Sequence, residues 1–470
     1  MPVSATSAST PKSLTRAERW KQGTALRKVA PRPAHAEWKT TPARSMPIER
    51  LMEQGKERIP DLLPVRYSRM KASPFAFLRG AAIVMANDLA KTPTSGLTVQ
   101  ACGDCHLANF GSYASPEGVP VFDINDFDET LPAPFEWDVK RLGTSLILAG
   151  QQGGLPAKAS RLLAENMTLT YATQMTRLAG LSPLEIWADR IDFVQALNAF
   201  EDRKVRQRLK TRVQEMMENQ RRHFGLIDSS GTRLRLHERP PLVMRLGAQE
   251  GDIQKAFERY RATQPPERVA LLKHYSLVDV IFKVVGVGSV GTFCAIGLFA
   301  TADGEPLLLQ IKEAQQSVLA PFAGASTLPS EGERVVAGQR MMQAVFDPFL
   351  GWTHSESPLP AKQKPSTTGE ERQFYVRRLK DARLAALGSD VAEEGLSDYA
   401  TLCGHTLARA HARTGDVAAI AGYIGKGRSF ANAIASFSVR YARQTELDWR
   451  AFCENLSTKN VLTAPKTLKK

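Results

Sequence analysis

Two stretches, CGDCHLAN at residues 102–109 and VFDINDFD at residues 121–128, decide how this chain is interpreted. The first places Asp104 five residues before Asn109 in a turn-rich segment, and the second is typical of a strand that ends at Asp126. Phosphoryl transfer needs a carboxylate at the attacking hydroxyl and oxygen ligands for Mg²⁺. We therefore expect Asp104 to orient the hydroxyl or accept its proton, and Asn109 and Asp126 to hold Mg²⁺.

A glycine-rich stretch, VVGVGSVGT, occupies residues 284–292 and matches the pattern G-x-G-x-x-G. Dinucleotide-binding folds share this pattern, but there a helix follows the glycines. Residues 293–299, FCAIGLF, are instead typical of a strand. The glycines therefore predict a hairpin over the phosphates of a nucleotide, with a plain structural hairpin and a dinucleotide oxidoreductase as alternatives. The expected nucleotide-binding residues are Gly286, Gly288, Ser289 and Gly291.

The next predicted strand, residues 307–314, contains Lys312. Because side chains alternate between the faces of a strand, the apolar residues at 307, 309 and 311 share one face and Lys312 lies on the other. We expect Lys312 to be catalytic and to contact the α- and β-phosphates. An acid on the following helix should position it, either Glu333 or Glu331. Glu333 also fits a capping box with Ser330, so a purely structural role for it stays open.

The motifs Gly-Asp-x-His-x-x-Asn and Ile-x-Asp-Phe-Asp resemble the catalytic segment of the aminoglycoside and choline phosphotransferases, a branch of the protein-kinase-like superfamily. Cys102 stands where those enzymes have His. The stretch Pro134-Phe-Glu-Trp-Asp138 is similar to the Pro-x-x-Asp-Leu helix start of that branch. The resemblance implies that Asp138 supports the catalytic loop, and it places His106 and Asp128 among the further supporting residues.

The two halves of this site occur in reverse order along the chain. In kinases the glycine loop and its lysine precede the catalytic and metal-binding aspartates. Residues 402–412, LCGHTLARAHA, are similar to the Leu-Ala-x-Leu-His helix that precedes the catalytic loop in small-molecule phosphotransferases. The order is therefore that of a ring cut before the catalytic loop. It implies an α+β, two-lobed, protein-kinase-like fold that is circularly permuted and carries a helical N-terminal extension.

Two histidines of the segment 402–412 are expected to be structural. His405 and His411 lie six residues apart on one predicted helix, which places them on different faces, so we do not expect a shared metal ion. Arg66, Arg69 and Arg79 could bind an acceptor or phosphate, but surface ion pairs are the favoured explanation, so we do not include them in the predicted site.

A second resemblance covers more of the chain. The stretches SPFAFLRG (73–80), NFGSYASPEG (109–118) and DINDFDETLPAPFEWDVKRL (123–142) resemble a bacterial family known as domain of unknown function 2252. This resemblance extends over most of residues 25–450 and implies no particular activity.

Composition and charge restrict the class of protein. Apolar residues make up 43% of the 470 residues, an ordinary globular content, and the net charge is +14. Residues 1–45 hold nine Lys or Arg against two Glu, and residues 455–470 hold four Lys and no acid, so the excess charge lies mainly in the tails. Without a dense basic stripe in the remaining sequence, we expect no specific nucleic-acid binding.

Five cysteines are too few and too scattered for a disulfide framework, and no secretory signal is visible, so we expect a reducing cytoplasmic location. The motif Cys102-x-x-Cys105-His106 also fits c-type haem attachment, which requires export, or zinc, which requires further ligands. The apolar stretch 277–300 contains Asp279 and Lys283, which favours strands over a membrane span.

These patterns divide the chain as follows. The expected segments are a disordered basic tail (1–45), a helical extension (46–98), the first part of a large lobe with the catalytic and metal loops (99–268), a small β lobe with the glycine loop (269–385), a helical second part of the large lobe (386–456) and a basic tail (457–470).

The sequence therefore predicts an ATP- and Mg²⁺-dependent phosphotransferase that acts on an unknown small-molecule or protein acceptor, most simply through a hydroxyl group. The alternatives are a non-catalytic nucleotide-binding regulator of the same fold and a transferase of nucleotidyl (AMP) groups. No membrane span is expected.

Overall fold

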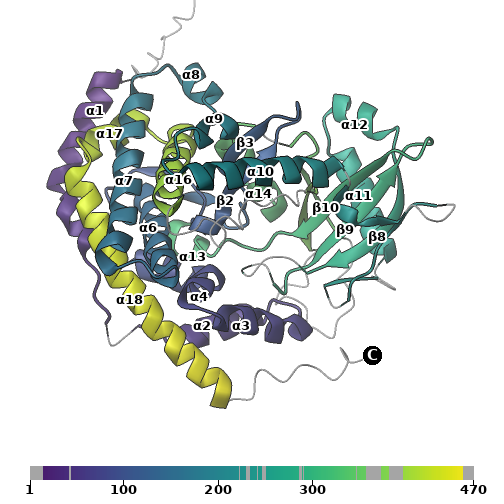
Figure 1. Cartoon of the computed structure of the whole chain (residues 1–470), viewed down its shortest axis with the longest axis horizontal. Coiled ribbons are helices and arrows are strands. Elements are labelled where there is room, and N and C mark those ends of the chain that lie inside the picture. The colour runs from purple at the N-terminus through teal and green to yellow at the C-terminus, as the bar shows by residue number, and fades with distance from the viewer. Residues whose placement is uncertain are drawn as a thin grey trace, which may run out of the picture.

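The computed structural model describes residues 14–41, 44–221, 223–228, 233–240, 242–245, 250–284, 288, 290–345, 347–355, 372–379 and 395–458. A large helical part lies beside a smaller part built on an antiparallel sheet (Figure 1). Helices and strands are thus mostly segregated, which confirms the predicted α+β class.

The helical part is organised around α6. This helix is buried on nearly all of its faces, because α4, α7 and α18 pack around it. Its polar residues Glu136, Asp138, Lys140 and Arg141 are also buried, and each has a polar partner, as burial of charge requires. The helices of this part are α6 (Phe135–Gln152), α7 (Ala157–Ala179), α8 (Pro183–Ala188), α9 (Phe193–Leu197), α10 (Arg203–Arg221), α16 (Leu396–Ala412), α17 (Val417–Ile424) and α18 (Arg428–Thr458).

Residues 46–98, the predicted helical extension, form short helices that lie along the lower side of the molecule in this view, against α6 and α18 (Figure 1). Its apolar side chains form a separate core with the C-terminal half of α18, through Phe452 and Leu456. The extension comprises α2 (Pro47–Gly55), α3 (Leu63–Lys71), α4 (Pro74–Gly80) and α5 (Ala82–Leu89).

The N-terminal segment differs from the prediction of disorder over residues 1–45. Helix α1 (Arg16–Ala25) packs along α17, so closely that a Cβ atom at Gly23 would lie 1.9 Å from the carbonyl oxygen of Ala419. Arg27 donates to the carbonyl of Tyr423, one of the last in α17, where helix carbonyls lack partners. The prediction of disorder is therefore wrong for residues 14–41. The basic side chains Arg27 and Arg32 of this segment donate to carbonyls at the end of α17 instead of being fully solvated. Residues 1–13 and 459–470 of the two predicted tails lie outside the described residues.

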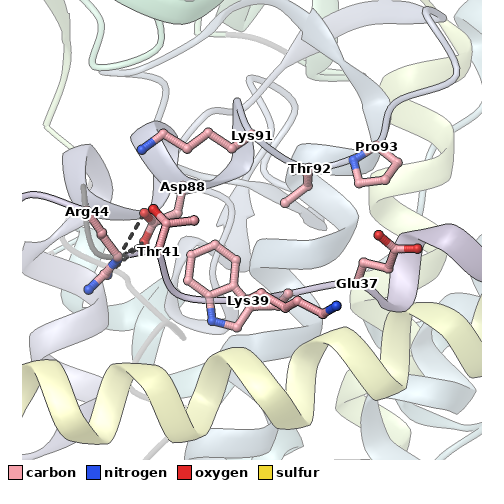
Figure 2. Close-up of a pocket in the computed structure, with 9 residues that line it drawn as sticks. Glu37, Lys39, Thr41, Arg44, Asp88, Lys91, Thr92 and Pro93 are labelled. Carbon is pink, nitrogen blue, oxygen red and sulfur yellow. Dashed lines mark hydrogen bonds and ion pairs between the residues drawn. The ribbon is translucent and has the colours of Figure 1, made fainter.

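Arg44 ties this N-terminal segment to the rest of the protein. Its Nη2 atom lies 2.7 Å from Asp88 Oδ2 and 2.6 Å from Asp448 Oδ2, and all three side chains are buried. Figure 2 shows Arg44 and Asp88 at one end of a pocket of about 230 Å³ between the N-terminal segment and the end of α5. The pocket is lined by Glu37, Trp38, Lys39, Thr41, Arg44, Asp88, Lys91, Thr92 and Pro93, and it includes none of the predicted site residues.

We expect Arg44→Ala to lower the free energy of unfolding by about 3–5 kcal/mol, because it leaves two buried carboxylates without their cation. Arg19→Ala is the matched control, since Arg19 pairs with Asp416 at a surface where both side chains are about one-third exposed, and such pairs contribute less than about 1 kcal/mol. Chemical denaturation of both variants measures the difference. Equal effects would show that the N-terminal segment is not held by Arg44.

The sheet has the strand order β11-β12-β10-β9-β8-β7, and every neighbouring pair is antiparallel. Its strands are β7 (Val243–Arg245), β8 (Ser276–Lys283), β9 (Cys294–Ala300), β10 (Pro306–Glu313), β11 (Gly351–His354) and β12 (Gln373–Arg378). The predicted strands at 293–299 and 307–314 correspond to β9 and β10. Strands β7 and β11 were missed because each is too short to show an alternating pattern.

Different helices cover the two opposite faces of the sheet. The helix α11 (Glu250–Ala262) packs on β8 and β11, and α14 (Glu331–Met342) on β11 and β12. The predicted lobe boundary at residue 269 is therefore too late, because β7 and α11 precede it and belong with the sheet. The stretch 277–300 forms β8 and β9 as expected, and within the described residues no helix is long and apolar enough to cross a membrane.

Side chains of β10 alternate as predicted. Leu309 and Ile311 belong to the core between the sheet and α11, whereas Leu308 belongs to the core on the opposite face. Lys312 lies on the same face as Leu308, where β12 contributes Tyr375 as its cross-strand neighbour. The strand therefore directs Lys312 away from α11, toward the helical part.

Candidate active site

Short strands bring the two acidic stretches together. Strand β1 (Thr98–Ala101), which leads into residues 102–109, pairs with β4 (Leu131–Pro134). Strand β2 (Phe110–Ala114), which follows those residues, pairs with β3 (Pro120–Ile124). The loop at residues 102–109 runs from β1 to β2, and the loop at residues 125–130 runs from β3 to β4. Because β1 pairs with β4 and β2 with β3, the two loops lie next to each other.

Asp138 braces the first loop, in the role that the resemblance implies. Its carboxylate, at the start of α6, accepts hydrogen bonds from the backbone N–H groups of Cys102 at 2.6 Å and Gly103 at 3.0 Å. His411 of α16 lies 3.1 Å from the same carboxylate and 2.9 Å from the hydroxyl of Tyr171. Gly103 has φ +81°, and a Cβ atom there would meet a backbone carbonyl at 2.4 Å, so the turn needs glycine.

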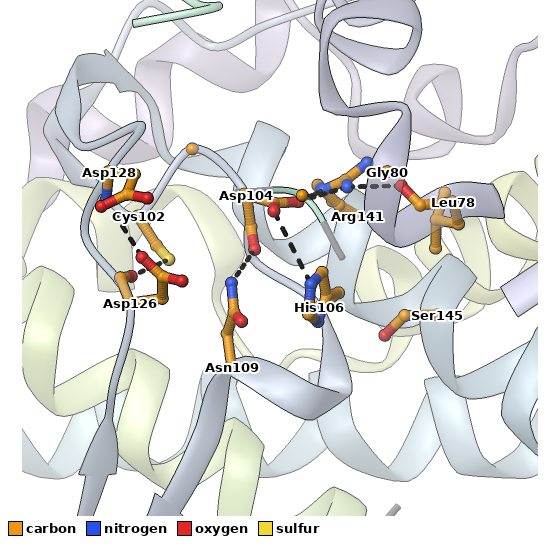
Figure 3. A network of polar contacts seen from close by, with 12 residues as sticks. Leu78, Gly80, Cys102, Asp104, His106, Asn109, Asp126, Asp128, Arg141 and Ser145 are labelled. Atoms are coloured by element: carbon orange, nitrogen blue, oxygen red, sulfur yellow. Dashed lines mark hydrogen bonds and ion pairs between the residues drawn. The ribbon is translucent and has the colours of Figure 1, made fainter. Parts of the chain in front are cut away.

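Asp104 follows this turn and is held by Arg141 of α6 (Figure 3). Arg141 Nε donates to Asp104 Oδ1 at 2.9 Å, and its Nη2 atom donates to the same oxygen and to the carbonyl of Leu78. His106 Nε2 lies 3.6 Å from the other carboxylate oxygen. Sequence reasoning missed Arg141, although its position three residues after Asp138 places both on one face of the helix.

The surroundings change the proton affinity of these groups. Burial raises the pKa of Asp104 to about 6, even though Arg141 favours the ionised form. Burial also lowers the pKa of His106 well below its usual value, and Arg79 and Arg141 act in the same direction. At neutral pH the pair is therefore a carboxylate next to a neutral imidazole, which suits a base and a positioning group.

Asn109 and Asp126 lie on neighbouring segments, because the backbone N–H of Asn125 donates to the carbonyl of Asn109 at 2.8 Å. Both side chains carry oxygen atoms. Asn109 Nδ2 donates to the carbonyl of Asp104 at 2.7 Å, and its Oδ1 atom accepts no hydrogen bond from any described residue. The Asp126 side chain is 30% exposed and accepts from the backbone N–H of Asp128 at 3.3 Å. The side-chain oxygens of Asn109 and Asp126 are suitable ligands for Mg²⁺. This ion prefers carboxylate and amide oxygens and completes its coordination shell with water and phosphate.

An all-protein metal site would need more ligands. In the described ranges, no group of three or more His, Cys, Asp or Glu side chains is arranged to hold a metal ion. Cys102 and Cys105 are both buried, and the Cys102 thiol donates to the carbonyl of Asp126 at 3.5 Å. The Asn109 and Asp126 oxygens thus fit a metal bound mainly through a nucleotide, which is the common mode for Mg²⁺.

Lys312 reaches this site from the sheet. Its Nζ atom contacts Asp128 Oδ2 and lies 4.0 Å from Asp126 Oδ1. The hydroxyl of Tyr375 donates to the other oxygen of Asp128 at 2.8 Å. Burial disfavours the charged lysine, but the two aspartates outweigh burial and raise its pKa. Two groups separated by 184 residues in the sequence therefore meet in one cluster.

Lys312 pairs with aspartates of the acidic loop and not with the glutamate of α14 that the sequence predicted. Among the described residues, the ion pairs of Lys312 are with Asp126 and Asp128, not with Glu333 or Glu331. Glu331 pairs instead with Arg334. The backbone N–H of Glu333 donates to the Ser330 side chain at 3.1 Å, which is the Ser330 half of the capping box considered as its alternative role.

Helix α14 nevertheless contacts the acidic loop, through an arginine. Arg334 donates to the carbonyls of Asp128 at 2.8 Å and Thr130 at 2.7 Å. A neighbouring acid that sequence reasoning missed, Glu129, accepts from the backbone N–H of Val318 at 2.7 Å, and burial raises its pKa to about 7. The loop after Asp126 is thus held by hydrogen bonds from the sheet part.

Part of the glycine stretch lies against Asp104. A Cβ atom at Gly288 would be 3.7 Å from Asp104 Oδ2 and 3.2 Å from the carbonyl oxygen of Arg79. Gly291 has φ +94°, a conformation that favours glycine. Gly286 and Ser289 lie outside the described residues. Gly288 therefore lies against the loop that carries Asp104, whereas Gly291 lies against Arg58.

Partners are identified for His411, which was expected to be structural, and for Arg66 and Arg79, whose roles the sequence left open. His411 is fully buried between Tyr171 and Asp138. Arg66 is buried and donates to the carbonyl of Gly80 at 2.8 Å, which braces α3 against α4. Arg79 stacks over the ring of Phe75 and adds positive charge near Asp104.

Residues 58–455 match the model of a family described as "Uncharacterized protein conserved in bacteria (DUF2252)". The chain belongs to this family. The DUF2252 match includes both acidic loops, the glycine stretch, Lys312 and α16, so every group of the cluster lies inside it. Neither the curated proteins nor the solved structures include a significant match to the chain.

Proposed function

We propose that this protein is an ATP- and Mg²⁺-dependent phosphotransferase with a circularly permuted, protein-kinase-like fold, and that it acts on a hydroxyl group of its acceptor. The observation that carries the proposal is the meeting of Lys312 with Asp126 and Asp128, next to Asp104. Kinase-type transfer needs a cation on the phosphates, an acid that holds the metal and an acid at the attacking group.

The order of elements in the sheet part supports the kinase-like assignment. The glycine stretch connects β8 and β9, Lys312 is on β10, and α14 follows before β11 and β12. Kinases place the glycine loop, the lysine strand and the next helix in this sequence.

The contact between α16 and the first loop supports the permutation. His411 of α16 binds Asp138, which in turn holds the turn at Cys102 and Gly103. A helix that follows the sheet strands in the chain thus supports the loop at residues 102–103, as the proposed permutation requires of the helix before the catalytic loop. Permutation is tolerated where the new break falls at the surface and few contacts are lost.

Each residue has a defined role in the proposed reaction. Asp104, oriented by Arg141, would bind the acceptor hydroxyl and accept its proton, and Asn109 and Asp126 would hold Mg²⁺. The metal ion supplies charge neutralisation between the phosphate oxygens and helps to align them. Lys312 would bind the phosphates, with Asp128 keeping its ammonium group in place.

Nucleotide binding and product mass test the proposal directly. Calorimetry with and without Mg²⁺ should detect ATP binding that the metal strengthens, and mass spectrometry of acceptor mixtures should detect a transferred phosphoryl group. A transferred AMP group would establish the nucleotidyl alternative, and binding without any product would favour a regulator. Failure to bind ATP in the presence of Mg²⁺ rules out the proposal.

The pKa of Asp104 predicts the pH dependence of the reaction. A base must be ionised, so turnover should rise as pH increases through about 6 and then level off. Below that value it should fall by about tenfold per pH unit, because the ionised fraction falls in that proportion. Turnover at saturating ATP, measured from pH 5 to 8 in one buffer system, provides the check. A flat profile over this range would remove Asp104 as the base.

A further inference from the structure

Arg58 and Ile59, at the start of the segment after α2, bind the backbone of the glycine stretch. Arg58 Nη1 donates to the carbonyls of Gly288 at 2.8 Å and Val290 at 2.7 Å. The backbone N–H of Ile59 donates to the carbonyl of Gly291 at 2.7 Å. Three carbonyls within four residues are therefore held by two neighbouring residues of the N-terminal extension.

Packing makes this contact specific. Arg58 is buried, with 4% of its surface exposed. A Cβ atom at Gly291 would lie 3.0 Å from the Cβ of Arg58. The aliphatic part of Arg58 can therefore pack this closely because Gly291 has no side chain. A buried guanidinium that donates to carbonyls orients them more firmly than a surface side chain, because water does not compete for its donors.

The same guanidinium lies in the field of acids from the loop after Asp126 and from β10. Burial lowers the pKa of Arg58, and Glu129, Glu313 and Asp128 act in the opposite direction by favouring the charged form. Glu313, at the end of β10, accepts from the backbone N–H of Phe293 at 2.8 Å, just beyond the glycine stretch. Arg58 therefore links the extension, the glycine stretch and the acidic loop electrostatically.

We propose that Arg58 is a positioning residue of the nucleotide site, which holds the backbone at Gly288 and Val290 so that Gly288 stays next to Asp104. The nucleotide-binding consequence rests on the proposed function, but the positioning of the segment does not. The helical extension is then a component of the active site and not only a support for α18. Loss of Arg58 frees the Gly288 and Val290 carbonyls and lets the segment move away from Asp104.

Amide hydrogen exchange tests the positioning without any ligand. In Arg58→Ala, exchange of the Phe293 amide should become faster by about tenfold or more, which corresponds to the loss of at least one charge-assisted hydrogen bond near it. The Ile311 amide, in the β9–β10 ladder, is the internal control and should keep its rate. An unchanged rate at Phe293 overturns the inference, whether or not the protein binds ATP.

Nucleotide affinity tests the functional consequence. The Kd for ATP in the presence of Mg²⁺ should rise by about tenfold in Arg58→Ala. Arg58→Lys keeps the positive charge and N–H donors but not the planar guanidinium, so it should recover part of the loss. Arg66→Met controls for the removal of a buried arginine from the same extension, because Arg66 binds Gly80 and not the glycine stretch. It should lower the melting temperature without a comparable change in Kd.

Three outcomes separate the two proposals. If the parent protein does not bind ATP, the proposed function fails, and the exchange rate alone decides the role of Arg58. If the parent binds ATP and both Arg58 variants bind equally well, Arg58 does not position the nucleotide site. If Arg58→Ala does not fold, Arg58→Lys is compared with the parent at equal stability. Faster exchange at Phe293 and a higher Kd in Arg58→Lys support the inference, and parent-like values of both overturn the requirement for the guanidinium.

Discussion

Asp104→Asn is expected to lower turnover by about 10²–10⁴-fold, the usual contribution of a positioned general base, while ATP affinity in the presence of Mg²⁺ stays close to that of the parent. Asparagine keeps the size of the side chain but cannot accept a proton. Asp104 is held by Arg141 and His106 and does not belong to the Asn109–Asp126 oxygen pair. The substitution should therefore act on the transition state and leave nucleotide binding alone.

Parallel measurements of turnover and calorimetric affinity decide this prediction. Arg141 would lose its carboxylate partner in Asp104→Asn, so the melting temperature should be recorded to separate a stability effect from a catalytic one. An asparagine variant that turns over like the parent would show that Asp104 is not the base. A variant that loses ATP binding would place Asp104 at the nucleotide instead of the acceptor.

Asp126→Ala is expected to weaken ATP binding by about 10–100-fold in the presence of Mg²⁺ and to have much less effect in its absence, because it removes a proposed metal ligand. Lys312→Ala should weaken ATP binding under both conditions, since the lysine contacts the phosphates directly in the proposed complex. The difference between the two variants therefore isolates the metal-dependent part of the affinity.

Asp303→Ala is the matched control for the change of charge. Asp303 lies exposed in the turn between β9 and β10, away from the cluster, and its removal should change neither affinity. Calorimetric titrations of all three variants, with and without Mg²⁺, complete the comparison. If Asp126→Ala behaves like Asp303→Ala, Asp126 does not hold the metal.

Local patterns determined much of what the sequence predicted correctly. The alternation of apolar side chains in residues 307–314 predicted correctly which face of the strand carries Lys312. Successive side chains of any strand point to opposite faces, whatever its surroundings. The support of the loop by Asp138 was implied by the resemblance at residues 134–138, and the structure shows it as hydrogen bonds to Cys102 and Gly103. The α+β class belonged to the same resemblance, and the structure contains both a helical part and an antiparallel sheet.

Partners from distant parts of the chain were decided only by the tertiary structure. The sequence predicted an acid on α14 for Lys312, but the folded chain supplies Asp128, because the loop that follows Asp126 reaches the sheet and Arg334 occupies the facing position on α14. Residues 14–41 looked disordered by composition, yet Arg27 finds the helix-end carbonyl of Tyr423.

The contact of Arg58 with the glycine stretch has the same character. Arg58 and Gly288 lie 230 positions apart, and the arginine binds a backbone carbonyl. Because every residue carries such a carbonyl, no side-chain pattern along the chain predicts this contact. The sequence by itself therefore determined the elements and the chemical groups of the candidate site. The packing of the extension and the sheet against the helical part decided which of those groups meet, because that choice depends on long-range contacts and not on local periodicity.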